Sequence, residues 1–122
     1  MDPNGKTPAD CVATPSTLDS VGYVFEAPAG AVLRTVTRLA GGATIAGVRA
    51  FRVGGAGATV NARADDSTLL PVDLSVVSAN TWMSAPGPPE TAVPAGTSLQ
   101  VEVTSVAGTV TYVVVQIDYE VT

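Results

Sequence analysis

The stretch TYVVVQIDYEV, residues 111–121, has the most regular alternation of side chains in the chain. Successive side chains of a β-strand point to opposite faces of the sheet, so this pattern predicts a long strand that is buried on one side. The polar face carries Gln116, Asp118 and Glu120. The face predicted to be buried carries Thr111, Val113, Val115, Ile117, Tyr119 and Val121. A second stretch, LQVEV at residues 99–103, alternates in the same way and predicts another strand.

Further strands are predicted earlier in the chain, at residues 21–25, 32–39, 45–53, 59–63, 72–76 and near 81–83. Gly41 and Gly42 separate two of these runs, which favours a hairpin there. Asp65-Asp66-Ser67 suits a polar turn, and Pro86-Gly-Pro-Pro89 suits an exposed loop because proline has no backbone N–H to donate. No segment has the pattern of an amphipathic helix. About eight strands of this length predict an all-β, two-sheet antiparallel β-sandwich with jelly-roll-like wiring.

The chain has 122 residues, which suits a single sandwich domain, predicted at residues 21–122. Residues 1–20 contain Pro3, Pro8 and Pro15 among polar side chains and predict an extended N-terminal arm. A sequence pattern that occurs twice in the chain fits a two-sheet fold. Pro28-Ala-Gly30, followed by Leu33 and Gly42, has the same spacing as Pro94-Ala-Gly96, followed by Leu99 and Gly108. We interpret the two segments as similar hairpins, one for each sheet.

The composition excludes several function classes. Only 14% of the residues are charged and 46% are hydrophobic, which is too apolar for a disordered chain. The chain contains no histidine, so it cannot build a His-dependent triad or a His-ligated metal site. A net charge of −5 argues against general nucleic-acid binding. A single cysteine, Cys11, allows no disulfide within the chain and favours synthesis in a reducing compartment. We expect neither a signal peptide nor a membrane span.

Few residues suggest catalysis or metal binding. Asp118 and Glu120 share a strand face, as solvent-facing side chains do, whereas a glycosidase needs carboxylates that face each other across a cleft. Asp65 and Asp66, with Asn61 and Asp73, offer oxygen ligands, but their spacing matches no calcium loop and turn chemistry explains the aspartates. We therefore expect no enzymatic activity, no cofactor and no metal site.

Aromatic residues make up 5% of the chain, and most of them are predicted to lie in the core. Those expected in the core are Tyr23, Phe25, Phe51 and Tyr119. Trp82, beside the proline-rich loop, is the candidate platform for stacking a sugar ring. The alternative for Trp82 is packing over an edge of the sandwich or at a contact between subunits.

Charge is distributed unevenly along the chain. Residues 27–64 contain five arginines and no acid, whereas residues 65–122 contain seven acids and no base. Arg34 and Arg38 are expected to share one strand face. Four of the five arginines lie on the predicted hairpin at residues 32–53. Arginine pairs well with carboxylates, so this hairpin suits an acidic surface, either Asp118 or Glu102 within the fold or another subunit. The candidate interface residues are Lys6, Cys11, Arg34, Arg38, Arg49, Arg52 and Trp82.

The polar arm, the Val/Thr-rich strands and the motifs Phe25-Glu-Ala-Pro-Ala-Gly30 and Pro94-Ala-Gly-Thr97 together resemble small jelly-roll structural proteins of tailed bacteriophages. The resemblance covers residues 21–121 and is greatest to the head decoration, or cement, proteins. It implies a non-enzymatic virion protein, made in the host cytoplasm, that lies on the outer capsid surface and stabilises the head. Its partners would be further copies of itself, as a homotrimer, and the major capsid protein, with no nucleic acid and no membrane. The arm would reach a neighbouring subunit or the capsid.

A second interpretation stays open. Pro-Ala-Gly-Thr before a strand also occurs in fibre and adhesin sandwiches, so the alternative function is a carbohydrate-binding or adhesin-type module. The sequence does not discriminate between the two by any single motif.

Overall fold

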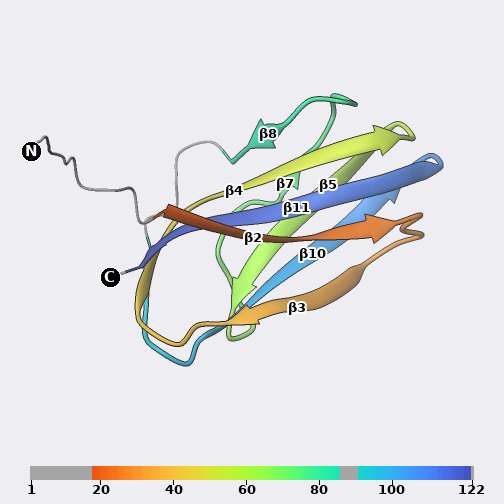
Figure 1. Ribbon diagram of the computed structural model, residues 1–122. Coiled ribbons are helices and arrows are strands. Elements are labelled where there is room, and N and C mark those ends of the chain that lie inside the picture. The colour runs from red at the N-terminus through yellow and green to blue at the C-terminus, as the bar shows by residue number, and fades with distance from the viewer. Residues whose placement is uncertain (1–17, 86–90, 122) are drawn as a thin grey trace, which may run out of the picture.

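The computed structural model describes residues 18–85 and 91–121, which fold into two antiparallel sheets of five strands each (Figure 1). One sheet, called here the β11 sheet, contains β2 (Leu18–Glu26), β11 (Val110–Val121), β4 (Ala43–Gly54), β8 (Met83–Ser84) and β9 (Thr91–Val93). The other, the β10 sheet, contains β3 (Val32–Arg38), β10 (Ser98–Ala107), β5 (Gly57–Ala64), β6 (Ser67–Thr68) and β7 (Leu74–Ser75). The predicted all-β sandwich is confirmed. No helix among the described residues is long and apolar enough to cross a membrane.

The strands pair in a nested order. β2 pairs with β11 and β3 pairs with β10, so the first strands along the chain meet the last ones. β4 pairs with the short strands β8 and β9, and β5 pairs with β6 and β7. Each sheet therefore combines strands from distant parts of the sequence, as in the jelly-roll wiring that the sequence predicts.

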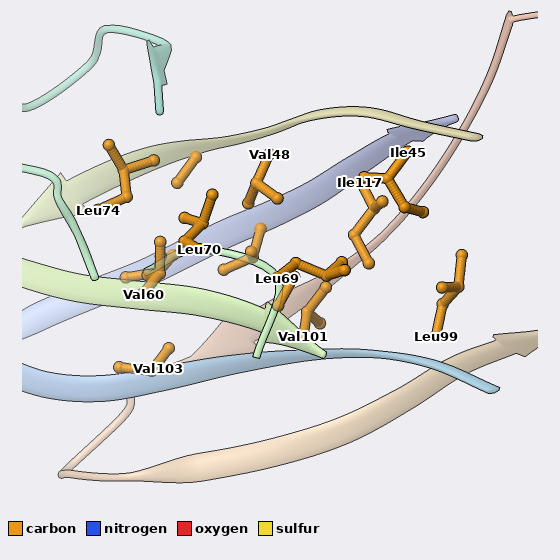
Figure 2. Close-up of a cluster of buried hydrophobic side chains, with 14 of the residues drawn as sticks. Ile45, Val48, Val60, Leu69, Leu70, Leu74, Leu99, Val101, Val103 and Ile117 are labelled. Atoms are coloured by element: carbon orange, nitrogen blue, oxygen red, sulfur yellow. The ribbon is translucent and has the colours of Figure 1, made fainter. Parts of the chain in front are cut away.

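The core lies between the two sheets and follows the alternation of the sequence. Val113, Val115 and Ile117 of β11 are fully buried. Leu99 and Val101 of β10 are also fully buried and lie in the same cluster, with further side chains from β4 and β5 (Figure 2). Burying a valine or leucine side chain contributes about 1.5–3 kcal/mol, so these alternating positions supply much of the stability of the sandwich.

The predicted hairpin at Gly41 and Gly42 is wrong, because β3 and β4 belong to different sheets. The favoured two-residue hairpin turns need a positive φ angle at the first central residue or at both, and neither glycine has one. The chain instead crosses from one sheet to the other. The crossing is held by two backbone hydrogen bonds of Leu39, from its N–H to the Thr97 carbonyl at 2.8 Å and from the Gly96 N–H to its carbonyl at 2.7 Å.

The two hairpins predicted from the repeated sequence pattern are also wrong. β10 and β11 also lie in different sheets, so neither of the two similar segments forms a hairpin. Each segment gives one strand to each sheet, and the equivalent strands lie side by side, β3 with β10 and β4 with β11.

Several boundaries also differ from the prediction. β2 begins at Leu18, so the sandwich includes three residues expected in the arm; residues 1–17 and the 86–89 loop lie outside the described residues. Only Leu74–Ser75 of the predicted 72–76 strand pairs, and Val72 is 78% exposed. In β11 a register shift next to Val110 buries that residue and leaves Thr111 exposed.

Candidate interaction surfaces

Arg52 is a buried arginine whose guanidinium donates hydrogen bonds to backbone carbonyl groups. Its side chain is 2% exposed. Its Nε donates to the Val76 carbonyl at 2.9 Å, Nη1 donates to the Gly54 carbonyl and to the Gly55 carbonyl at 2.9 Å, and Nη2 donates to the Val77 carbonyl at 3.1 Å. These bonds tie the turn after β4 to residues 76–77. The Arg52 guanidinium is therefore used inside the subunit.

Two other arginines form ion pairs within the fold. Arg49 Nε lies 3.2 Å from one carboxylate oxygen of Asp118, and the other oxygen of that carboxylate accepts a hydrogen bond from the Ser20 hydroxyl. Arg63 Nε lies 3.0 Å from a carboxylate oxygen of Glu102 on the neighbouring strand. The pairing predicted between the 32–53 segment and Asp118 is thus confirmed for Arg49, whereas Glu102 pairs with Arg63, which lies outside that segment.

Arg34 and Arg38 are exposed on β3, at the edge of the β10 sheet. Neither forms an ion pair with any residue in the described part of the chain; Arg34 Nη1 donates to the neighbouring Leu33 carbonyl. The prediction that the two share one strand face is wrong. Arg34 lies opposite Val101 and Arg38 opposite Ser98, and a bulge at Val36 turns the two side chains to opposite faces.

Trp82 lies on the outer face of the β11 sheet and is 47% exposed. Its ring packs 5.4 Å from the Phe51 ring, and the Arg49 guanidinium carbon lies 5.3 Å from its centre. Phe51 lies beside Val114, and Val114 beside Val24, in the register of the sheet. These four apolar side chains, Val24, Val114, Phe51 and Trp82, cross the outer face from one edge to the other and are called here the outer apolar row.

The other aromatic predictions have mixed outcomes. Phe25 is buried, as expected, and Tyr119 packs partly against the core. Tyr23 is 41% exposed, and Phe51 lies on the outer apolar row, so the prediction that both lie in the core is wrong. The alternation of a strand shows which side chains share a face, but the pairing of the sheets decides which face is covered.

The outer face of the β10 sheet is polar, and many of its side chains form ion pairs or hydrogen bonds with one another. Glu102 pairs with Arg63, and the Gln100 side chain donates to Asp66 at 3.0 Å. Asn61 is 2% exposed and donates to Asp73 at 2.8 Å. The two outer faces of the sandwich therefore differ, since only the face of the β11 sheet carries a continuous row of apolar side chains.

The acidic residues considered for metal binding are engaged in local hydrogen bonds. Asp65 accepts a bond from the Ser98 backbone N–H at 2.9 Å, Asp66 accepts one from Gln100, and Asp73 accepts one from Asn61. Within residues 18–85 and 91–121, no three potential ligands of this kind come together as a metal site would require. Asp118 is likewise paired with Arg49 and Ser20.

A groove lies on the side of the sandwich where β2 and β3 are the last strands of their sheets. Its volume is about 580 Å³, and its walls include Tyr23, Phe25, Glu26, Val32 and Arg34. The Tyr23 and Phe25 rings pack against each other in a tilted arrangement, with their centres 4.9 Å apart. Sequence reasoning missed this groove, because the groove depends on β2 and β3 being edge strands on the same side of the sandwich.

Comparison with known proteins yields one structural similarity. No protein-family model matches the chain, and no curated protein matches it. A chain of the structure titled "Cyanophage Pam1 capsid asymmetric unit" is similar over 100% of this chain and 97% of its own length, with a TM-score of 0.54 and 19% sequence identity. At this identity the match shows a shared fold. The resemblance to phage structural proteins is thereby confirmed at the level of the fold.

Proposed function

We propose that this protein is a non-enzymatic structural component of a phage capsid. In this proposal it forms a homo-oligomer, a trimer, that binds the major capsid protein on the outer surface of the head and stabilises the shell. The observation that carries the proposal is the full-length similarity to a chain of a phage capsid asymmetric unit.

The surface of the sandwich supports a role in assembly. Val24 and Trp82 are each 47% exposed at the two ends of the outer apolar row, and Val72 and Val77 are 78% and 64% exposed on the side of the short strands. Monomeric soluble proteins rarely expose large contiguous apolar patches, and such patches often mark sites of protein–protein interaction. Many weakly bound copies on a shell also gain strength from multivalency.

The proposed contacts follow from where the candidate residues lie. Arg34 and Arg38 are exposed on β3, and Trp82 is exposed beside Arg49 on the β11 sheet. Lys6 and Cys11 belong to residues 1–17, outside the described part of the chain. We assign this segment the role of an arm that lies across a neighbouring subunit, where main-chain hydrogen bonds to a strand edge would supply affinity. Arg52 contributes indirectly, by fixing the loop beside Val77.

Co-sedimentation with capsid shells tests this function. Shells assembled from the major capsid protein of the same virus are mixed with the purified protein and pelleted, and their melting temperature is measured with and without it. We expect saturable co-sedimentation and a higher melting temperature of the shell. Absence of binding to the shells at micromolar protein would overturn the proposal.

Carbohydrate binding is the second candidate, and it is favoured by one observation. Trp82 presents an exposed ring on an open sheet face with Arg49 beside it, an arrangement on which a sugar ring can stack. In this alternative, a glycan array shows binding by the native protein that is lost in Trp82→Ala. If the native protein gives no glycan signal, this candidate is eliminated.

A further inference from the structure

We infer that copies of this chain associate through the open side of the sandwich, with the acidic edge strand β2 of one copy against the basic edge strand β3 of the next. The inference rests on the proposed homo-oligomer and specifies its contact. It follows from the unpaired strand edges, their opposite charges and the groove between them.

The two edges on this side are long and unpaired. β2 is nine residues long and β3 is seven residues long. Within the described residues, β2 pairs with β11 alone and β3 pairs with β10 alone. The opposite side of the sandwich is instead finished by two- and three-residue strands, β6 to β9 (Figure 1). A long open edge exposes backbone donors and acceptors and readily pairs with another chain, so natural sheets usually shorten or cover such edges.

The charges on the two edges are opposite. β2 carries Asp19 and Glu26 and no basic residue, whereas β3 carries Arg34 and Arg38 and no acidic residue. All four side chains are exposed. None of them is joined to a residue of opposite charge elsewhere in the described part of the chain. Pairing of β2 with β2, or of β3 with β3, would bring like charges together, whereas β2 with β3 of another copy is attractive.

Apolar groups on the same side provide area to bury. Tyr23 is 41% exposed and Leu33 is 38% exposed, on β2 and β3 respectively. The groove of about 580 Å³ between the edges has Tyr23, Phe25 and Arg34 in its walls. It can receive side chains from the facing edge of a neighbour, and Arg34 is placed to meet a carboxylate there.

A contact between unlike edges also sets the symmetry. Each copy offers one acidic and one basic edge, so successive copies can join β2 to β3 until the ring closes. Every edge on this side is then covered. A ring closed in this way is consistent with the proposed trimer.

Charge reversal followed by charge exchange tests the contact. Two double variants each place like charges on both sides of the proposed contact between β2 and β3: Arg34→Glu/Arg38→Glu and Asp19→Arg/Glu26→Arg. We expect either variant to weaken association on the order of 100-fold. The variant carrying all four substitutions exchanges the two edges. It should associate with itself but not with the native protein. Association is measured by analytical ultracentrifugation and native mass spectrometry, and circular dichroism checks the fold.

A matched control places negative charge on the opposite side. Thr68→Glu/Ser75→Glu adds two carboxylates at exposed positions of the short strands β6 and β7, and its association should equal that of the native protein. If the native protein is oligomeric and the edge reversals leave it so, or if the four-substitution variant stays monomeric while folded, the inference is wrong and the proposed function stands. A native protein that is monomeric at all concentrations overturns both.

Discussion

At the scale of single residues, Arg52 shows how a charge can be buried in this sandwich without an acid beside it. Its five N–H donors are arranged as a fixed fork, and the structure places four backbone carbonyls around that fork. The sequence indicates that Arg52 belongs to a basic segment. It does not indicate that the side chain lies in the interior, since the carbonyls come from two loops that meet only in the folded chain.

Arg52→Ala leaves these carbonyls without their donor, and unsatisfied buried groups are costly. We expect the free energy of unfolding to fall by about 3 kcal/mol, with a smaller loss for Arg52→Lys, which keeps the charge but not the fork. Urea denaturation followed by circular dichroism measures the change. Ser78→Ala, an exposed substitution next to Val77, is the control and should change stability by less than about 0.5 kcal/mol. A loss as small as that for Arg52→Ala would contradict the role given to this residue.

Ala27 carries local backbone strain. Its φ angle is +45°, a conformation that suits glycine, in the short connection between β2 and β3. Ala27→Gly should raise the free energy of unfolding by about 0.5–1 kcal/mol, because relief of the strain exceeds the added entropy of the unfolded chain. Ala29→Gly, in the same connection without a positive φ angle, should be neutral or destabilising. Equal effects of the two substitutions on thermal unfolding would argue against strain at Ala27.

At the scale of elements, the close approach of β2 to β11 depends on a residue without a side chain. A Cβ atom at Gly22 would lie 2.5 Å from the Val115 carbonyl oxygen, which belongs to the backbone of β11. A Cβ atom at Gly47, in β4 of the same sheet, would meet nothing within 4 Å. The two glycines therefore form a matched pair for testing how tightly the edge strand is held.

Gly22→Ala should lower the free energy of unfolding by about 1–3 kcal/mol, as overpacked sites do, and Gly47→Ala should have little effect. The loss should be local to β2. Hydrogen–deuterium exchange should therefore rise in residues 18–26 more than in β10. Uniformly faster exchange, or equal effects of the two substitutions, would show that the spacing of β2 and β11 is not limited by Gly22.

The long strands could be predicted from the sequence, but the short strands and the pairing partners could not. The alternation of β10 and β11 predicts both strands and most of their buried residues, including Val113, Val115 and Ile117. The Gly-Gly signal at residues 41–42 predicts a local hairpin, whereas β3 pairs with β10, about sixty residues away in sequence. Long-range pairing of this kind depends on the whole fold. The bulge that turns Arg34 and Arg38 to opposite faces could not be predicted either, because the spacing of the two residues indicates a shared face.

At the scale of the whole molecule, the sandwich presents three different surfaces. The outer face of the β10 sheet is bonded to itself, the outer face of the β11 sheet carries the outer apolar row, and the side formed by β2 and β3 carries open edges with opposite charges. If copies join through the charged edges, the outer apolar row stays free for a second partner. The proposed functions of self-association and capsid binding then use separate surfaces.

This separation predicts that the two associations respond differently to salt. Association of copies through charged edges should weaken as ionic strength rises from about 0.05 M to 0.5 M, because salt screens exposed charges. Binding to shells through the outer apolar row should be insensitive to salt over that range and should weaken in Trp82→Ala. Sedimentation at several salt concentrations measures both. The same salt dependence for the two associations would show that they share one surface.

A cryo-electron microscopy map of shells assembled with the protein shows whether this chain is a structural subunit bound to the outside of a phage capsid. We expect density for the two-sheet sandwich at regularly repeated positions on the outer surface, and no such density on shells assembled without the protein. Identical maps with and without the protein would show that the chain does not bind the outside of the capsid.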